Sequence, residues 1–264
     1  MPNPADDENP TSQSFGSVSG SSSAFEEGVD QVACTYSIVT TCYNEAANID
    51  NLVGNLLACF EQHFPGESFE LVVVLNGPTD ETPTLARALA ARHSQLRLVE
   101  LAVNQGYGGG IRAGLAAARG EYIGYVDGDE QVLAPDVARV FAAARQSKSD
   151  IVKVVRVKRE DGFSRLVITS VYNILFRVLF GFFCLDVNGK PKVLKRSALE
   201  KLALTSRDWF IDAELMITAH NVGMTIEEIP VTFHQREGGT SNVRMSTIFE
   251  FLQNMWAYKR RRKR

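Results

Sequence analysis

The sequence has few cysteines and no paired arrangement of them. Among its 264 residues the only cysteines are Cys34, Cys42, Cys59 and Cys184, and no two of them form a C-x-x-C pair. The four histidines likewise show no spacing that suits zinc. These absences exclude a structural zinc site and a disulfide framework, and they favour a reducing compartment.

Two common phosphate-binding patterns are also missing. The glycine-rich stretch at residues 104–114 (NQGYGGGIRAG) fits neither G-x-G-x-x-G nor G-x-x-x-x-G-K-[ST]. The sequence therefore does not support a dehydrogenase or an ATPase.

There is no large excess of charge of either sign. Lys plus Arg number 28 and Asp plus Glu number 31, so the net charge is −3, which argues against a nucleic-acid-binding body. The charges are uneven, since residues 1–30 carry acids and no Lys or Arg, whereas residues 259–264 (KRRRKR) are all basic. The first residues lack a basic segment followed by an apolar one, so we expect no secretory signal and a cytoplasmic location.

The order of apolar and polar segments predicts an α/β fold. Hydrophobic residues make up 45% and charged residues 22%, as in globular proteins. We expect a disordered, acidic, Ser/Gly-rich arm over residues 1–33, one domain over 34–258, and a basic tail over 259–264. Within the domain, apolar runs alternate with helical patterns, which is typical of a Rossmann-like sheet flanked by helices. The expected strands are 35–40, 70–75, 96–101, 122–127 and 150–157, and the expected helices are 47–60, 82–92, 109–118 and 135–145.

Two apolar segments of the C-terminal half suggest contact with a membrane surface. Residues 166–185 are long enough to span a bilayer, but Arg177 near their middle disfavours spanning. On a helix, Leu166, Thr169, Asn173 and Arg177 would share one face, and Ile168, Val171, Leu175, Val178, Leu179 and Phe182 the other. The segment could therefore be an interfacial helix or a buried core helix. Residues 248–258 place Trp256 and Tyr258 just before the basic tail, which suits an anionic lipid surface, although a solvated tail would look the same.

The strongest chemical signal is Asp127-Gly128-Asp129, directly after the apolar run YIGYV. Two carboxylates at the end of a parallel strand lie at the edge where open α/β sheets bind ligands. Carboxylate oxygens also suit a hard divalent cation that bridges phosphate groups. Taken alone, D-x-D is a weak signal, because turns also favour Asp and Gly.

Further segments give this motif its context. In order along the chain they are YSIVTTCYNEAAN at 36–48, VVVLNGPTDET at 72–82, NQGYGGGIRAG at 104–114, GEYIGYVDGDEQ at 120–131, DVNGKPKVLKR at 186–196, WFIDAEL at 209–215 and IPVTFHQREGGTS at 229–241. In order and spacing they resemble family 2 glycosyltransferases of the GT-A fold, and among them the polyprenyl-phosphate sugar synthases such as dolichol-phosphate mannose synthase. The resemblance covers about residues 35 to 245.

The resemblance implies a nucleotide-sugar site, with Tyr43 and Glu45 at the base and ribose and the 104–114 loop beside the diphosphate. The sequence departs from the family where two acids are usual, because Leu75 and Asn76 stand there. Asn76 retains an acceptor oxygen but not the negative charge. The implied nucleotide-sugar residues are Thr41, Tyr43, Glu45, Asn76, Asp80, Gly106, Arg112, Asp127 and Gly128. From the residues alone, Glu45 could instead be a helix-start acid and Asp80 a helix cap.

The resemblance also implies the metal, acceptor and catalytic residues. Mg²⁺ or Mn²⁺ would be held by Asp127, Asp129 and Gln131. The acceptor phosphate would meet Arg156, Arg159, Arg165, Arg236 and Ser241, since guanidinium groups suit phosphate. The catalytic residues would be Asp129, Arg236 and Asp212. Asp212 and Glu214 stand where related enzymes with hydroxyl acceptors keep a general base, although both could equally cap a helix.

The expected function is metal-dependent, inverting transfer of a hexose from a nucleotide sugar of the GDP-mannose or UDP-glucose type to a polyprenyl phosphate. We expect it at the cytoplasmic face of a membrane, with a separate membrane protein as a plausible partner and no nucleic acid. One alternative is a glycosyltransferase with a soluble glycan or small-molecule acceptor. Another is a non-catalytic module that binds a nucleotide sugar or a membrane.

Overall fold

The computed structural model describes residues 33–159, 163–182, 184–234, 255–256 and 258–260. Within residues 158–171 only the backbone is described. The expected arm at 1–33 thus lies almost wholly outside the described residues, as do four residues of the basic tail. Two of the predicted site residues, Arg236 and Ser241, also fall outside them.

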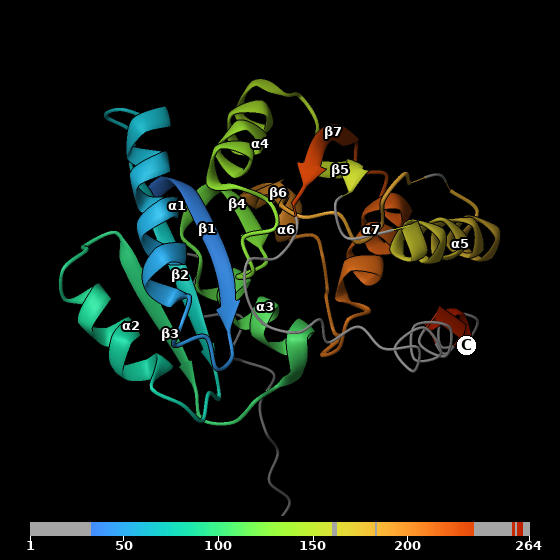
Figure 1. Cartoon of the computed structure of the whole chain (residues 1–264). Coiled ribbons are helices and arrows are strands. Elements are labelled where there is room, and N and C mark those ends of the chain that lie inside the picture. The colour runs from blue at the N-terminus through green and yellow to red at the C-terminus, as the bar shows by residue number, and fades with distance from the viewer. Residues whose placement is uncertain (1–32, 160–162, 183, 235–254, 257, 261–264) are drawn as a thin grey trace, which may run out of the picture. The chain divides into compact units, whose positions relative to one another are not determined.

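A mixed, seven-stranded sheet forms the centre of the described chain, in the order β3-β2-β1-β4-β6-β5-β7 (Figure 1). Its first part is parallel, with β1 between β2 and β4, while β6 runs antiparallel to both β4 and β5. The strands are β1 Cys34–Cys42, β2 Phe69–Asn76, β3 Leu96–Leu101, β4 Gly120–Val126, β5 Ile151–Arg159, β6 Lys192–Lys195 and β7 Ile226–Phe233.

Helices follow the strands because polar, Gly- or Pro-containing loops end each apolar run and amphipathic segments begin after them. Pro83 and Pro135 stand in the first turns of two helices. Proline is tolerated there because backbone N–H groups of the first turn have no hydrogen-bond partner within the helix. The helices are α1 Ile49–His63, α2 Thr82–Ala90, α3 Gly106–Ala117, α4 Ala134–Gln146, α5 Phe163–Phe180, α6 Arg196–Leu199 and α7 Ile211–Asn221.

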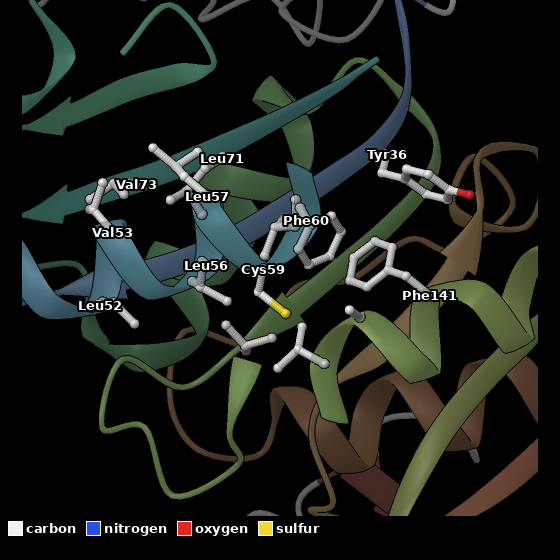
Figure 2. Packing of buried hydrophobic residues seen from close by; sticks show 14 of the residues in the cluster. Tyr36, Leu52, Val53, Leu56, Leu57, Cys59, Phe60, Leu71, Val73 and Phe141 are labelled. Carbon is white, nitrogen blue, oxygen red and sulfur yellow. The ribbon is translucent and has the colours of Figure 1, made fainter. Parts of the chain in front are cut away.

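Two apolar cores lie on opposite faces of the sheet. Residues of α1, α2 and α4 form one with the sheet, and residues of α3, α5 and α7 form the other. In the first core, shown in Figure 2, Tyr36 of β1 and Phe60 of α1 meet the ring of Phe141 from α4. Strands covered on both faces explain the nearly continuous apolar runs of the parallel part.

The expected elements of the first half are confirmed to within a few residues at their ends, and so is the α/β class. The segment at 166–185 needs correction, because α5 ends at Phe180 and Gly181 follows with φ +79°, a value that favours glycine. The predicted apolar face was incomplete. Phe176, which was not assigned to the apolar face, is fully buried, whereas Val178 is 73% exposed.

The α5 helix thus has features of both alternatives. Tyr172 and Phe176 belong to the second core, while Ile174 and Val178 face outward with Arg177. Among the described residues, none of the helices has both the length and the apolar character that crossing a bilayer requires.

Candidate active site

The carboxyl ends of β1, β2 and β4 meet at one edge of the sheet, as the sequence predicts. The parallel register places Thr41 of β1 opposite Val74 of β2, and Thr40 opposite Val126 of β4. The next residues after these strands are therefore neighbours in space. Asp127, Gly128 and Asp129 lie there, directly after β4.

The loops at this edge are held in specific conformations. Asn44 and Glu130 have positive φ angles of 54° and 53°, which is uncommon for residues other than glycine. The Asn44 side-chain oxygen accepts a hydrogen bond from the Thr79 amide at 2.7 Å, and that of Glu130 accepts one from the Asn55 amide group at 2.8 Å. Strained backbone of this kind gathers at functional sites.

The predicted base and ribose residues follow β1. Tyr43 is 46% exposed, so its ring is open to a ligand. The Glu45 carboxylate accepts a hydrogen bond from the Asn48 side chain at 2.9 Å. Asp80 accepts bonds from the backbone amides of Thr82 at 3.0 Å and Ala46 at 3.3 Å.

These bonds give Asp80 a low pKa. Its slight burial acts to raise the pKa, but the hydrogen bonds from Thr82 and Ala46 outweigh that effect. Asp80 is therefore ionised and joins the loops after β1 and β2. Its bond to Thr82, the first residue of α2, agrees with the helix-cap alternative, and the nucleotide-sugar assignment stays a prediction.

The side chain of Asn76 is used within the fold. It is buried, and its amide nitrogen donates to the Gly106 carbonyl at 3.0 Å while its oxygen accepts from the Gln105 amide at 2.9 Å. Asn76 thereby fixes the start of the glycine-rich loop. Arg112, further along α3, donates to the Thr205 carbonyl at 3.1 Å.

The glycines of this loop allow two stretches of backbone to pack closely. Gly106 has φ +78°, and a Cβ there would lie 2.3 Å from the Arg207 carbonyl oxygen. A Cβ at Gly108 would lie 2.7 Å from the carbonyl oxygens of both Ser206 and Asp208. The Gly109 amide also donates to the Arg207 carbonyl at 3.2 Å. The glycines at these positions thus allow close packing against residues 206–208.

Close to the D-x-D motif, the residues around Val126 form a small cleft. It is lined by Val126, Asp127, Asp129, Val132, Lys190 and Phe233. Gln131 is committed to the end of β7, because its side-chain nitrogen donates to the His234 carbonyl at 3.0 Å. Its side-chain oxygen is thus the only atom of that group still suited to bind a metal.

Lys190 is a basic residue that lines this cleft. Its Nζ lies 3.0 Å from Asp127 Oδ2 and 3.4 Å from Asp212 Oδ2, and it donates to the hydroxyl of Tyr107 at 2.7 Å. The Tyr107 hydroxyl in turn donates to Asp127 Oδ1 at 2.8 Å. Burial alone would lower the pKa of Lys190, but the two carboxylates outweigh it and raise that pKa above its ordinary value.

Asp212, in the first turn of α7, is buried beneath this cleft. It accepts a hydrogen bond from Tyr125 at 2.7 Å and forms ion pairs with Lys190 and Lys192. Burial would raise the pKa of Asp212, but the two ammonium groups lower it. Burial lowers the pKa of Lys192 to about 8. Asp212 is thus buried and paired with two lysines, and its assignment as a base stays a prediction.

An aromatic pair covers one side of this network. The rings of Tyr107 and Trp209 are stacked, with centroids 4.2 Å apart and planes 15° apart, and Lys190 Nζ lies 4.7 Å from the Tyr107 centroid. The loop before Trp209 is held by Glu214, which accepts backbone bonds from Thr205 and Ser206. The stack therefore fixes where the Tyr107 hydroxyl lies.

Arg156, a predicted acceptor-phosphate residue, forms a two-pronged ion pair with Asp186. Its Nε and Nη2 donate to the two carboxylate oxygens at 2.7 and 2.8 Å, and its guanidinium lies 5.0 Å from the centre of the Phe233 ring. The backbones of Arg159 and Arg165 lie in β5 and α5, but their side chains are outside the described set. The acceptor assignment stays a prediction for all of these residues.

Comparison with models of known protein families shows which family the chain belongs to. A model described as glycosyl transferase family 2 matches residues 37–203, more than half of the chain. The chain belongs to glycosyl transferase family 2. The predicted family is thereby confirmed, and with it the expectation of a glycosyltransferase.

Several members of the family are similar over most of this chain. Glycosyltransferase AglD of Haloferax volcanii is 32% identical over 76% of the chain, which spans only 33% of that protein. The dolichyl-phosphate β-glucosyltransferase of Drosophila melanogaster is 25% identical over 85% of the chain and 73% of its own length. The dodecaprenyl-phosphate galacturonate synthase of Rhizobium johnstonii is 28% identical over 83% and 64%.

Solved structures confirm the predicted fold. Glucosyl-3-phosphoglycerate synthase of Mycobacterium tuberculosis, solved with Mn²⁺, UDP and phosphoglyceric acid, matches with a TM-score of 0.66 at 19% identity, over 85% of this chain and 77% of that one. The mixed sheet of this family 2 glycosyltransferase is therefore a GT-A fold.

The donor set of the cleft fits a divalent cation. Asp127 and Asp129 both line it, and carboxylate oxygens are what Mg²⁺ and Mn²⁺ prefer. Within the described ranges, His, Cys, Asp and Glu form no group of three that could hold a metal ion. Two carboxylates are enough for Mg²⁺ when substrate phosphates and water supply the other ligands.

Sequence reasoning about this family 2 glycosyltransferase missed four side chains of the network: Tyr107, Tyr125, Lys190 and Lys192. One signal was available, because Lys192 begins the short strand β6 directly before Val193 and Leu194, and a lysine in a buried strand needs a partner. The antiparallel register then places it opposite Tyr125. Nothing in the sequence pointed to Asp212, 20 residues away, as that partner.

Proposed function

We propose that this chain transfers a hexose from a nucleotide sugar to the phosphate of a polyprenyl phosphate. The observation that carries the proposal is the cleft at the sheet edge, where Asp127 and Asp129 lie beside Lys190. Two relatives support this acceptor class, because they are named as a dolichyl-phosphate β-glucosyltransferase and a dodecaprenyl-phosphate galacturonate synthase, and each is similar over more than four fifths of this chain.

The donor would bind across the ends of β1 and β4. The exposed ring of Tyr43 and the carboxylate of Glu45 would face the base and ribose, while Asp127 and Asp129 would hold Mg²⁺ or Mn²⁺. When bound, the cation supplies positive charge that neutralises the leaving diphosphate. Structural neighbours solved with Mn²⁺ and UDP support this assignment.

The acceptor phosphate is already an anion, so the reaction needs little help from a base. A phosphate oxygen attacks the anomeric carbon, the bond from that carbon to the diphosphate oxygen breaks, and the nucleoside diphosphate leaves with the electron pair. The ion pairs of Asp212 with Lys190 and Lys192 agree with this scheme, because they leave that carboxylate no ready access to an acceptor hydroxyl. We infer inversion at the anomeric carbon from this direct attack.

A lipid acceptor also implies contact with a membrane surface. Ile174 and Val178 of α5 are exposed, and Lys259 donates to the Leu179 carbonyl at 2.7 Å, which ties residues 258–260 to this helix. Trp256 is 56% exposed, with the Arg260 guanidinium 4.4 Å from its ring centre. Apolar and aromatic side chains beside basic ones suit an anionic lipid interface. We infer peripheral attachment at the cytoplasmic face, with the basic tail and a membrane protein as further contacts.

A soluble phosphate-bearing acceptor is the second candidate, since the neighbour from Mycobacterium tuberculosis was solved with phosphoglyceric acid. The test is release of nucleoside diphosphate from UDP- and GDP-sugars with detergent-solubilised polyprenyl phosphate, 3-phosphoglycerate or neither. Asp129→Asn is the control without the proposed metal ligand. We expect release only with the lipid and a loss of about 100-fold or more in the variant, a barrier change of near 3 kcal/mol. Release with 3-phosphoglycerate alone would favour the second candidate, and nucleotide binding without any release would favour a non-catalytic module.

A further inference from the structure

Among the described residues that line the cleft, Lys190 carries the positive charge, and the resemblance to the family gave it no role. Its side chain is only 9% exposed, yet it reaches the cleft beside Asp127. A buried ammonium group costs several kcal/mol of solvation unless partners compensate it. The fold supplies those partners from three separate elements.

The ammonium group is held by oxygen atoms on three sides. Tyr107 comes from α3, Asp127 follows β4, and Asp212 comes from α7. Two of these contacts are hydrogen bonds, to Tyr107 and Asp212, and the contact with Asp127 is an ion pair. The position of the charge is therefore fixed before any substrate arrives, which is how preorganised sites stabilise phosphate charge.

A purely structural lysine would have no reason to line the cleft. Lys192 shows the contrast, because it is 0% exposed, pairs with Asp212, and is absent from the lining. Lys190 shares Asp212 with Lys192 but also reaches the carboxylate proposed to hold the metal. A diphosphate bound to that metal would thus lie next to the Lys190 ammonium group.

We propose that Lys190 is a phosphate-binding residue of the donor site, whose ammonium group contacts the diphosphate of the nucleotide sugar. The inference rests on the proposed function, because it takes the donor to bind at Asp127 and Asp129. The Tyr107 hydroxyl, between Lys190 and Asp127, positions the ammonium group through the stack on Trp209.

The test uses Lys190→Met, which keeps the length of the side chain and removes its charge. The matched control is Lys201→Met at an exposed position outside the cleft lining. Calorimetric titration with UDP and GDP in EDTA measures the phosphate contact without metal. We expect binding about 10- to 100-fold weaker in Lys190→Met and unchanged in Lys201→Met, the range for one charged hydrogen bond.

A second titration separates contact with phosphate from mere support of Asp127. Mn²⁺ binding without nucleotide is followed by electron paramagnetic resonance. If Lys190 acts on phosphate, the variant binds Mn²⁺ as well as the wild type or better, since a cation has been removed from beside the metal ligand. Weaker Mn²⁺ binding in parallel with weaker nucleotide binding would overturn the proposal, because Lys190 would then only hold Asp127 in place.

Two further binding measurements distinguish a failure of this inference from a failure of the proposed function. Farnesyl phosphate serves as a short acceptor probe, and loss of its binding with nucleotide binding intact would overturn the donor assignment. If the wild type bound neither UDP nor GDP, the proposed function would fail and the inference with it. Near-UV circular dichroism checks folding, and Lys190→Gln, with the same expected losses, replaces the methionine variant if that one does not fold.

Discussion

Asp212→Asn distinguishes an anchor from a catalytic base. The Asp212 carboxylate is buried between two lysines, with Nζ of Lys190 3.4 Å away. At an effective dielectric constant of about 20, one such pair of charges interacts by about 5 kcal/mol, and part of that offsets desolvation. Removing one member of a buried pair costs about 3 to 5 kcal/mol, because the partner charge stays buried. We therefore expect Asp212→Asn to lower the free energy of unfolding by that amount.

Urea unfolding followed by circular dichroism measures this change. The free energies of the wild type and the variant can be compared if their m-values are equal. The double variant with Lys192→Met removes one of the stranded charges, so it should recover at least about 1 kcal/mol of what the single variant loses. Wild-type stability in Asp212→Asn, together with loss of transfer, would refute the anchor interpretation and restore the base.

Three further predictions concern the surroundings of the site and the core. Gly108→Ala places a methyl group against backbone that cannot yield easily, so we expect a loss of about 1 to 3 kcal/mol in urea unfolding together with reduced transfer; unchanged values for both would contradict the close packing. The ion pair with Arg156 lowers the pKa of Asp186 against the effect of burial. The stabilisation from ionised Asp186 is thus fully present above the ordinary Asp pKa near 4 and is lost below that pKa at up to about 1.4 kcal/mol per pH unit. Between pH 5 and pH 3 the free energy of unfolding of Asp186→Asn should therefore fall less steeply with pH than that of the wild type. Phe141→Ala empties a fully buried ring site and should cost about 3 to 5 kcal/mol, and a loss below 1 kcal/mol would contradict the packing in Figure 2.

The first half of the fold could be predicted because each of its elements carries its own signal. The run at 36–40 (YSIVT) has no charged residue and is buried throughout, since β1 lies between two parallel strands and is covered on both faces. The acids after β4 follow from the same topology, which brings the ends of parallel strands to one edge. These patterns are local, so one sequence is enough to recognise them.

The second half and the lysine network could not be predicted in the same way. The strand β6 has only four residues, and two of these are lysines, so it shows no apolar alternation. Tyr107 and Lys190 lie 83 positions apart, and only tertiary packing brings them together. Pairings at such separations depend on tertiary structure, which composition and period do not encode.

The most direct test of the account is mass spectrometry of the lipid extract after the protein has been incubated with Mg²⁺ or Mn²⁺, a polyprenyl phosphate and a panel of UDP- and GDP-sugars. The account predicts a new lipid, heavier than the polyprenyl phosphate by one hexosyl residue, with one donor of the panel and not with Asp129→Asn. An unchanged lipid with every donor, from protein that binds the nucleotides, would contradict it.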